Sequence, residues 1–339
     1  MKVDASLGNI ATGPSDVAAA AARLEAIGYD GLWIGESGHD PTVMVTEAVR
    51  ATERVDIGTA VVIAFARTPM VVAHTAYDLQ GLSRGRFILG IGSQVKAHIE
   101  RRFSMPWSKP AARMREYVQA LRAIWACWQD GAPLAFAGEF YTHTLMTPFF
   151  SPPAHQWGPP PVIVAGVGER MTEVAGEVAD GFFVHPFTTE RYLREVTLPA
   201  LQRGRARSEG PLEKLTVTGP SFVTVGRDEA EMRTAMAGTK RQIAFYASTP
   251  AYRPVLELHG WSDLQVELNA LTRAGRWSDM ADLITDDMVA AFSVVGDPAQ
   301  VAEALHRKLG DVFERVTPYA TYQTDPDLWP ELLAAFRKV

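Results

Sequence analysis

The stretch Arg86-Phe87-Ile88-Leu89-Gly90-Ile91-Gly92 is an apolar run that ends in a glycine turn. It lies between two longer amphipathic stretches, Pro69–Leu82 and Ala111–Trp128, in which apolar residues recur at helical spacing. A short apolar run between two helices is typical of a buried strand in a parallel sheet. We therefore predict a β/α unit at this point, with the run as its strand.

The same alternation of short apolar runs and amphipathic stretches continues on both sides of this unit. Together the runs make eight strands that alternate with helices, which implies parallel strands with right-handed crossovers. An open doubly wound sheet explains part of this pattern, but eight units favour an α/β fold of the closed (β/α)8 TIM type, with residues 1–339 as a single domain. The other strands are predicted at Val3–Leu7, Gly31–Gly35, Asp56–Phe65, Pro161–Ala165, Gly181–His185, Leu215–Val225 and Val312–Pro318, and the other helices at Ser15–Ile27, Pro41–Arg50, Met171–Ala179, Glu190–Arg205, Asp228–Phe245, Pro298–Leu309 and Asp327–Arg337.

Two segments interrupt the alternation. Residues Gly131–Pro160, after the helix that follows strand four, are rich in Pro, Phe, Tyr and His, and Gly138–Thr144 within them resembles a hairpin. A second irregular segment, Ala247–Asp287, comes after the helix that follows strand seven. We expect both insertions to form a lid and a substrate pocket. The aromatic residues of the first suggest an apolar substrate portion, or else they pack the insertion or a dimer interface; they are Phe136, Phe140, Tyr141, Phe149, Phe150 and Trp157.

The composition limits the class of function. The chain has 339 residues, of which 47% are hydrophobic and 21% charged, with a formal net charge of −6, so a nucleic-acid-binding surface is not expected. A single cysteine excludes an internal disulfide. The sequence shows no secretory signal and no apolar run long enough to span a membrane, so we expect a cytoplasmic protein that does not bind membranes.

In a barrel of this class the active site lies at the carboxyl ends of the strands. The densest polar cluster at any strand end is Gly35-Glu36-Ser37-Gly38-His39-Asp40-Pro41, after strand two. His39 is able to exchange a proton near neutral pH, and either Glu36 or Asp40 could orient its ring. The plainer interpretations are that His39 is only a loop residue and that Asp40 caps the helix starting at Pro41. For Asp40 we favour the role of helix cap.

Glycine-rich turns follow strands four and five. In Gly90-Ile91-Gly92-Ser93 the paired glycines allow a backbone to approach a ligand closely, although the third glycine of a dinucleotide fingerprint is missing. Ala165-Gly166-Val167-Gly168 directly precedes a predicted helix, whose N-terminal N–H groups favour an anion. We favour a phosphate site over a plain tight connection there.

Basic residues gather beyond strand four, and they could hold an acidic ligand tail or simply form a solvated helix face. No histidine pair has metal-binding spacing, so no metal site is predicted. The nucleophile elbow of hydrolases and the phosphate loop of NTPases are also missing from the sequence. The basic residues are Lys96, Arg101, Arg102, Lys109 and Arg113.

In the residues at these strand ends, the sequence resembles the bacterial luciferase-like monooxygenases and the F420-dependent reductases that share their barrel. The resemblance covers nearly the whole chain and is most specific in Asp78–Ser93, around strand four. The phrases Phe65–Met70 and Arg102–Ser108 resemble a subgroup described as F420-dependent oxidoreductases. The other matching segments are Ala22–Trp33, Arg54–Ala60 and Pro161–Gly181.

The resemblance implies a cofactor site with a flavin-type ring in the barrel mouth. His39 falls on the position of a family histidine near the reactive ring carbon, which would donate the proton or orient the substrate. The bond Ala60–Val61 matches a non-proline cis peptide that lies against the ring in the F420 branch. Gly92 and Ser93 match residues near the ring and the ribityl chain. The cofactor-phosphate loop matches Ala165, Gly166, Val167 and Gly168.

The resemblance therefore predicts an F420-dependent oxidoreductase that transfers a hydride to or from a small organic substrate. The alternative on the same fold is an FMN-dependent monooxygenase that uses O2 and a reduced flavin. The basic residues beyond strand four favour F420, because its glutamate tail is acidic and FMN has no such tail. A third alternative is a non-catalytic barrel that has lost its cofactor, against which the intact glycines argue.

The loop Gly92-Ser93-Gln94 departs from the family's Gly-Thr-Gly or Gly-Ser-Gly, and a sugar-phosphate substrate is not favoured. A homodimer is expected by family analogy.

Overall fold

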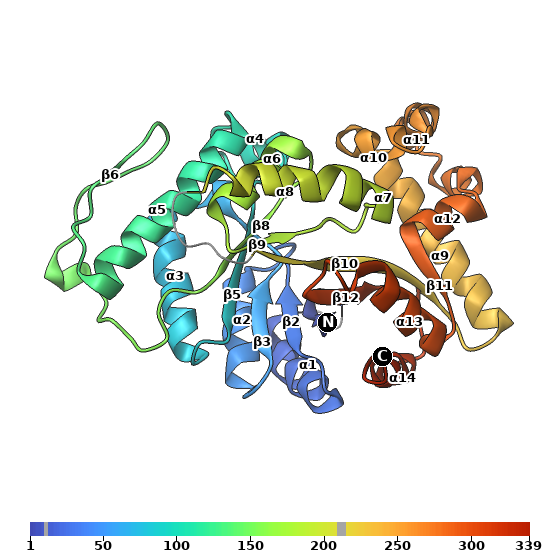
Figure 1. Cartoon of the computed structure of the whole chain (residues 1–339), viewed down its shortest axis with the longest axis horizontal. Coiled ribbons are helices and arrows are strands. Elements are labelled where there is room, and N and C mark those ends of the chain that lie inside the picture. The colour runs from blue at the N-terminus through green and yellow to red at the C-terminus, as the bar shows by residue number, and fades with distance from the viewer. Residues whose placement is uncertain (10–12, 209–214) are drawn as a thin grey trace. The chain divides into compact units, whose positions relative to one another are not determined.

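The fold is known from a computed structural model that describes residues 1–9, 13–208 and 215–339 (Figure 1). Its contacts divide the chain into two compact units, which are described separately. The larger unit contains Asp4–Phe183 and Ala200–Thr216. The smaller unit contains Met1–Val3, Val184–Pro199 and Val217–Val339.

The larger unit is built on parallel strands in the order β1-β2-β3-β5-β8-β9. Their register places Leu32 beside Ile57 and Ile91 beside Val164, so that buried aliphatic residues of neighbouring strands face one another. A two-residue strand, β4 (Val62–Ile63), continues from β3 and pairs with β5. The strands are β1 (Lys2–Ser6), β2 (Gly31–Ile34), β3 (Asp56–Thr59), β5 (Phe87–Gly92), β8 (Val162–Ala165) and β9 (Gly181–Phe183).

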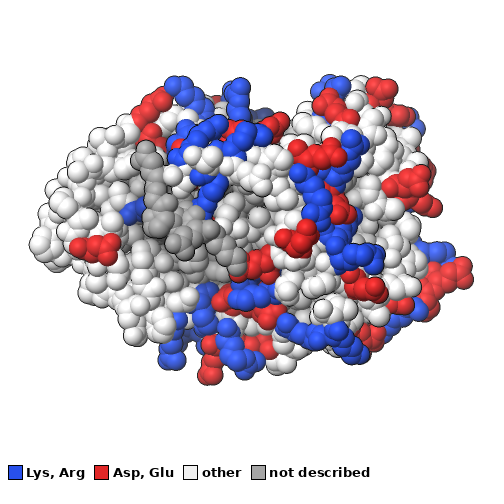
Figure 2. All heavy atoms as spheres, viewed as in Figure 1, with Lys and Arg blue, Asp and Glu red and all other residues white. Residues whose placement is uncertain are grey.

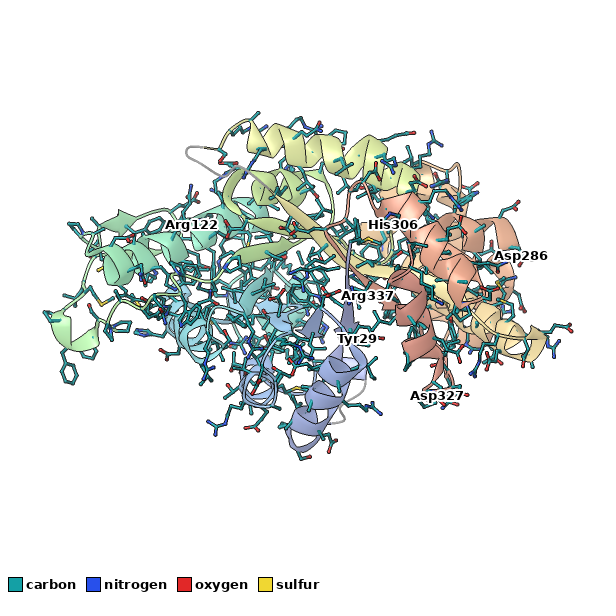
Figure 3. The ribbon with its side chains drawn as sticks, turned by 60° about the horizontal axis from the view of Figure 1, so that its bottom comes forward. Tyr29, Arg122, Asp286, His306, Asp327 and Arg337 are labelled. Atoms are coloured by element: carbon teal, nitrogen blue, oxygen red, sulfur yellow. The ribbon has the colours of Figure 1, made fainter. Side chains whose placement is uncertain are left out.

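Helices follow these strands, as the amphipathic stretches predict. Arg122, labelled in Figure 3, lies on the longest of them and pairs with Asp180 at 2.9 Å, which ties the helix to the residue just before β9. The helices are α1 (Pro14–Ile27), α2 (Pro41–Arg50), α3 (Pro69–Leu82), α4 (Lys96–Arg101), α5 (Pro110–Asp130), α6 (Glu169–Val178) and α8 (Leu198–Arg205).

The smaller unit holds the remaining parallel strands, in the order β11-β10-β12-β1. A buried cluster that includes Phe222, Leu256 and Phe292 forms its core. The strands are β10 (Thr216–Val225), β11 (Ser293–Gly296) and β12 (Arg315–Tyr319), and the helices are α7 (Glu190–Tyr192), α9 (Glu229–Ala247), α10 (Arg253–Glu257), α11 (Ser262–Arg273), α12 (Asp286–Phe292), α13 (Pro298–Leu309) and α14 (Leu328–Phe336).

The predicted α/β fold of the (β/α)8 TIM type is confirmed. The structure nevertheless differs from the sequence predictions in several places. The single strand expected over 56–65 is broken after Thr59, and the segment 247–287, expected to be irregular, is largely helical. Neither β11 nor α4 was predicted, and α1 begins at Pro14, one residue before the predicted start at Ser15.

A glycine in β3 makes room for the buried side chain of Trp33 in the larger unit. A Cβ on Gly58 would lie 2.1 Å from the ring of Trp33, a distance that no packing tolerates. Trp33 is 2% exposed, donates its ring N–H to Asp4 at 2.8 Å, and meets Phe183 edge to face. Glycine at this position therefore has a packing reason.

The first insertion contains the predicted hairpin, as the antiparallel pair β6 (Phe136–Ala137) and β7 (Thr142–His143). Its turn is held by one carboxylate of α5, because Glu116 accepts the backbone N–H groups of Glu139, Phe140 and Tyr141 at 2.6–2.9 Å. These bonds fix the hairpin turn against α5.

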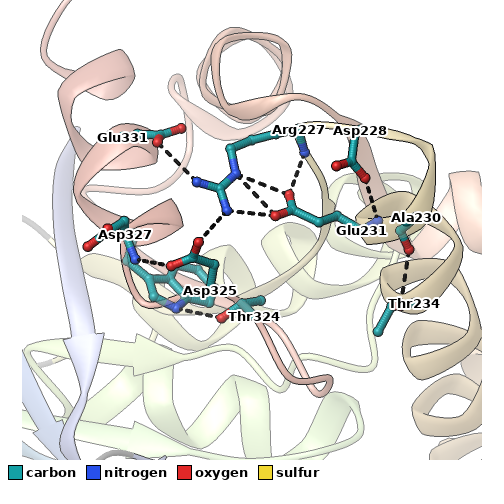
Figure 4. A network of polar contacts seen from close by, with 10 residues as sticks. Arg227, Asp228, Ala230, Glu231, Thr234, Thr324, Asp325, Asp327 and Glu331 are labelled. Atoms are coloured by element: carbon teal, nitrogen blue, oxygen red, sulfur yellow. Dashed lines mark hydrogen bonds and ion pairs between the residues drawn. The ribbon is translucent and has the colours of Figure 1, made fainter.

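In the smaller unit, an arginine at the end of β10 joins the start of α9 to the C-terminal segment (Figure 4). Arg227 contacts Glu231 and Asp325, the latter at 2.7 Å, and reaches Glu331 at 3.3 Å. These contacts raise the pKa of Arg227, chiefly through the hydrogen bond to Glu231. The network links residues that are far apart in the sequence.

Within the described ranges, none of the helices combines the length and the apolar character that crossing a membrane requires.

Candidate active site

Four strand ends that the sequence analysis singled out lie side by side in the larger unit. The strands β2, β3, β5 and β8 are consecutive neighbours in the sheet. The Ala60 N–H donates to the Ile34 carbonyl at 2.8 Å, and the register pairs Gly92 with Ile63 on one side and with Ala165 on the other. The structure therefore brings the predicted residues of all four loops to one edge of the sheet.

The bond Ala60–Val61 is a non-proline cis peptide, as the resemblance implied. It lies between β3 and β4, at the point where the expected strand over 56–65 is broken. The side chain of Val61 lies over the end of β5, where a Cβ on Gly92 would come within 2.8 Å of it. On the other side, the Val61 carbonyl accepts a long hydrogen bond from the Glu36 N–H at 3.4 Å.

The glycines at the end of β5 have packing reasons that do not involve a ligand. A Cβ on Gly90 would lie 1.8 Å from the carbonyl oxygen of Thr59 in the neighbouring strand. The Thr59 hydroxyl in turn donates to the Gly90 carbonyl and accepts from its N–H. Ser93 donates to the Gln94 carbonyl at 3.0 Å and is half-buried. A ligand role for Gly92 and Ser93 thus stays a prediction, beside a packing role that the structure shows.

Glu36, whose role the sequence leaves open, is the anchor of the 61–67 segment. Its side chain is only 5% exposed. It accepts the Ile63 N–H at 2.8 Å and both of its oxygens face Arg67, at 2.8 and 2.9 Å. The carboxylate therefore ties the end of β2 to the chain that follows the cis peptide, and within the described ranges it makes no hydrogen bond to His39.

Arg67 extends this contact to the next helix. Its second nitrogen donates to Asp40 at 2.9 Å, while Asp40 also accepts the Thr42 N–H at 2.8 Å and so caps α2, as predicted. Burial alone would raise the pKa of Asp40, but the bonds from Thr42 and Arg67 outweigh it and lower that pKa. The Glu36–Arg67–Asp40 bridge therefore fixes both ends of the loop that carries His39.

His39 lies on the exposed part of that loop. Its Nε2 atom is 3.7 Å from where a Cβ on Gly13 would be, at the start of α1. Among the described residues, no hydrogen bond to the His39 ring is found. Within the described residues, both ring nitrogens are therefore without a hydrogen-bond partner.

The loop after β8 leads into the N-terminus of α6. Gly168, with φ of 83°, precedes the helix and provides no side-chain cap. Of the first-turn side chains, Glu169 is paired with Arg203, and Arg170 is exposed. Uncapped N–H groups at a helix start favour an anion, which agrees with the predicted phosphate loop at Ala165, Gly166, Val167 and Gly168.

The basic residues beyond β5 do not form the free cluster that the sequence suggested. Arg113 is 6% exposed and lies over the ring of Phe65, donating to Tyr141 and to the Pro106 carbonyl. Arg102 donates to the Ser37 carbonyl at 2.8 Å. The two lysines are paired with glutamates, Lys96 with Glu100 and Lys109 with Glu139.

Of three aromatic residues of the first insertion, one is packed against a neighbouring ring and two are exposed to solvent. Tyr141 meets Tyr117 edge to face, with ring centroids 5.4 Å apart. In contrast, Phe149 is 90% exposed and Phe150 66% exposed. The exposed pair fits the interface alternative better than packing within the insertion.

A second polar cluster, in the smaller unit, was not singled out from the sequence. His185, two residues after β9, accepts the Phe187 N–H on Nδ1 at 3.1 Å, and its Nε2 lies 3.0 Å from the Tyr252 hydroxyl. The hydroxyls of Tyr246 and Tyr319 are 3.2 Å apart. The position of His185 at a strand end is the one signal that could have pointed to this cluster, because its tyrosines come from distant segments.

The burial of His185 predicts a dependence of stability on pH. Burial lowers the pKa of His185 to about 4, against about 6.5 in an unfolded chain. Between these values the unfolded chain binds a proton that the folded chain does not. The free energy of unfolding should therefore fall as the pH drops from about 6.5 to about 4, with this residue contributing about 3 kcal/mol.

Urea unfolding at several pH values would measure this contribution, with His185→Gln as the comparison. The variant should lose stability less steeply than the parent over the same pH range. Equal pH slopes for the two proteins would show that His185 titrates normally in the folded chain.

Comparison with known proteins identifies the family to which the chain belongs. The sequence profile of the luciferase-like monooxygenases matches residues 2–312. The chain belongs to this family. Membership in the luciferase-like family places it among oxidoreductases, as the sequence resemblance predicted.

Several relatives and solved structures match most of the chain. An uncharacterized protein of Mycobacterium tuberculosis is 50% identical over 318 residues, which is 94% of this chain and 93% of that protein. The 5,10-methylenetetrahydromethanopterin reductase of Archaeoglobus fulgidus is 27% identical, over 82% of this chain and 81% of its own. The coenzyme F420 dependent tetrahydromethanopterin reductase of Methanopyrus kandleri has the same fold, with a TM-score of 0.76, 20% identity and coverage of 98% and 97%.

Proposed function

We propose that this luciferase-like protein is an F420-dependent oxidoreductase that transfers a hydride between the deazaflavin and an organic substrate. The observation that carries the proposal is the meeting of four loops at one sheet edge, with His39, Val61, Gly92 and Gly168 each on a different loop. Two relatives named after F420 or methanopterin chemistry support it. The cytoplasmic location expected from the sequence is part of the same proposal.

The residues present fit a flat ring joined to a phosphate. At the end of β5, Gly92 has no side chain, and Val61 lies directly over it. At the neighbouring strand end, the first turn of α6 is uncapped and its only acidic residue, Glu169, is neutralised by Arg203. The ring would rest near Val61 and Ser93, and the phosphate near Gly166–Gly168.

When bound, F420 supplies the site of hydride exchange, because its ring carries two electrons and a proton as one unit. The chain supplies position and the second proton. His39, exposed and free of hydrogen bonds to the described residues, is the group that we assign to that proton. The Glu36–Arg67–Asp40 bridge keeps the His39 loop in place beside the segment that carries Val61.

An FMN-dependent monooxygenase is the second candidate. The observation that keeps it open is the pairing of Lys96 and Lys109 with glutamates, and the burial of Arg113, since these residues were the argument for an acidic cofactor tail. Arg101 and Arg102 remain exposed and could still hold such a tail.

Titration with F420 and, separately, with FMN, followed by fluorescence quenching, tests the choice. Tight binding of F420 with weak binding of FMN is the expected result. The reverse order would favour the monooxygenase. Binding of neither would leave the non-catalytic barrel and overturn the proposed function.

The homodimer expected for this family is also proposed, with the first insertion at its interface. Residues 131–160 contain one charged residue, Glu139, while Leu145 and Phe149 are 79% and 90% exposed. On the face seen in Figure 2, charged side chains are sparse where this insertion lies. Exposed apolar side chains in such a segment are typical of an interface.

Replacing both exposed phenylalanines, Phe149→Asp and Phe150→Asp, should convert the dimer into a monomer without unfolding the chain. Light scattering after gel filtration measures the mass, and Val266→Asp on α11, 56% exposed, is the control for a charge placed elsewhere. A parent protein that is already monomeric, or a double variant that stays dimeric, would refute this interface.

A further inference from the structure

The aromatic cluster of the smaller unit gathers where three of its segments reach the carboxyl ends of barrel strands. His185 follows β9, Tyr319 is the last residue of β12, and the register pairs Tyr319 with Phe222 in β10. Tyr246 comes from α9 and Tyr252 from the turn after it. Carboxyl ends of strands are where barrels of this class place substrates.

The hydrogen bonds of the cluster leave donors unused. Because Nδ1 of His185 accepts the Phe187 N–H, the proton of the neutral ring is on Nε2 and points to the Tyr252 oxygen. The Tyr252 hydroxyl hydrogen is then not needed for this pair. Between Tyr246 and Tyr319 one hydroxyl donates and the other accepts, so one more hydrogen is left over.

The cluster is also uncharged. Burial lowers the pKa of His185 to about 4 and raises that of Tyr252 to about 12, so both are neutral near pH 7. Within the described part of the chain, none of the hydrogen bonds of His185, Tyr246, Tyr252 and Tyr319 involves a charged side chain. A charged ligand group would therefore find no counter-ion here.

The surroundings are flat and apolar. The ring of Tyr252 stacks on His185 at 4.5 Å, and Tyr246 meets His185 edge to face at 5.0 Å. Phe187 and Phe222 complete the wall from behind, both at most 2% exposed. The four polar side chains are half-buried, so each keeps part of its surface exposed while Tyr246, Tyr252 and Tyr319 pack against the core of the unit.

We propose that the pairs His185–Tyr252 and Tyr246–Tyr319 form a substrate-binding wall for an uncharged molecule with an oxygen acceptor on a flat apolar body. The oxygen accepts the free hydroxyl hydrogen of Tyr252, and the body lies against the aromatic rings. This inference deepens the proposed function and takes its chemical meaning from it, because it names the class of molecule that the oxidoreductase would act on.

Acetophenone and benzoate test the wall, since they have nearly the same size and differ in charge. Ligand-observed NMR titrations are made on the full chain, with and without F420. Acetophenone should bind at least about tenfold more tightly than benzoate, because a carboxylate would be desolvated without a partner. Tyr252→Phe should weaken acetophenone binding about three- to tenfold through the lost hydrogen bond.

Tyr322→Phe is the matched control in the same unit. It removes a hydroxyl that bonds the backbone at Val223 and Val225, outside the cluster, and should leave acetophenone binding unchanged. Thermal unfolding of both variants shows that they are folded. Should Tyr252→Phe fail to fold, toluene takes its place as the test: it has the same flat body without an oxygen acceptor, and should bind the parent about three- to tenfold less tightly than acetophenone.

The inference is overturned if acetophenone does not bind, if benzoate binds as tightly, or if the folded Tyr252→Phe variant binds like the parent. Its failure is distinguishable from failure of the proposed function. A protein that binds acetophenone through Tyr252 but does not bind F420 keeps the wall and loses the F420 proposal. A protein that binds F420 but shows none of these probe effects keeps the F420 proposal and loses the wall.

Discussion

Replacing Arg67 by alanine is expected to destabilise the protein by about 3–5 kcal/mol, the usual cost of removing one partner from a buried ion pair. The Glu36 side chain is 5% exposed and that of Arg67 19% exposed. Without the guanidinium, the Ile63 N–H is the one partner that the described residues leave to the Glu36 carboxylate. Asp40 loses one contact but retains its bonds to Thr42 at the start of α2.

Urea unfolding would measure the loss, with Arg233→Ala as the control. Arg233 and Glu229 form an ion pair of the same length, 2.8 Å, but their side chains are 66% and 90% exposed, so that its removal should change little. The double variant Glu36→Gln with Arg67→Met should be more stable than Arg67→Ala, because no buried charge is left unpaired. Equal effects of Arg67→Ala and Arg233→Ala would show that the bridge does not stabilise the fold.

The Arg67→Ala change should also weaken F420 binding, provided that the variant is folded. The bridge spans the two loops on which His39 and Val61 lie, and its loss frees both. Arg67→Lys is the conservative test. Lysine keeps the charge but is unable to contact Glu36 and Asp40 with two separate nitrogens, so it should restore part of the stability and less of the affinity.

The parts of the fold that the sequence predicts best are those where local chemistry alone sets a boundary. The helices at 41–50, 69–82 and 298–309 were predicted with the bounds that the structure shows. In each, a proline occupies the first helical position, and the residue before it caps the helix with its side chain. Such signals act over three or four residues and need no tertiary context.

The parts that the sequence does not predict depend on contacts between distant residues. Arg67 meets Glu36 from 31 positions away, and Tyr252 meets His185 from 67 positions away. Neither pair has a spacing that any local pattern would reveal. The resemblance to the family did locate the break at Ala60–Val61, whereas the apolar composition of 56–65 alone predicts an unbroken strand.

The glycines at the end of β5 also have a role that the sequence alone does not identify. The sequence predicts that the pair Gly90 and Gly92 allows close approach of a ligand. The structure shows that Gly90 is needed for the approach of the neighbouring strand, at the Thr59 carbonyl, and Gly92 for the side chain of Val61. A glycine motif thus signals close approach of some group, but the sequence alone does not identify the group.

Replacing His39 by alanine is expected to lower turnover about 10²- to 10⁴-fold, the usual contribution of a positioned acid or base, and to leave F420 binding and stability nearly unchanged. The expectation follows from its surroundings. The side chain is exposed and makes no hydrogen bond to the described residues, so its removal takes nothing from the fold. The loop itself stays fixed by Glu36, Arg67 and Asp40.

Turnover would be measured with the substrate that a screen of uncharged, oxygen-bearing compounds provides, and F420 affinity by the quenching titration. Ser37→Ala on the same loop is the control, because this change removes a side chain whose loop contact to Arg102 is made by the backbone carbonyl. His39→Gln should be as slow as His39→Ala, since an amide keeps a hydrogen bond but exchanges no proton. Turnover at the parent rate in His39→Ala would remove His39 from the mechanism and move the search for the proton donor to the other loops at this sheet edge.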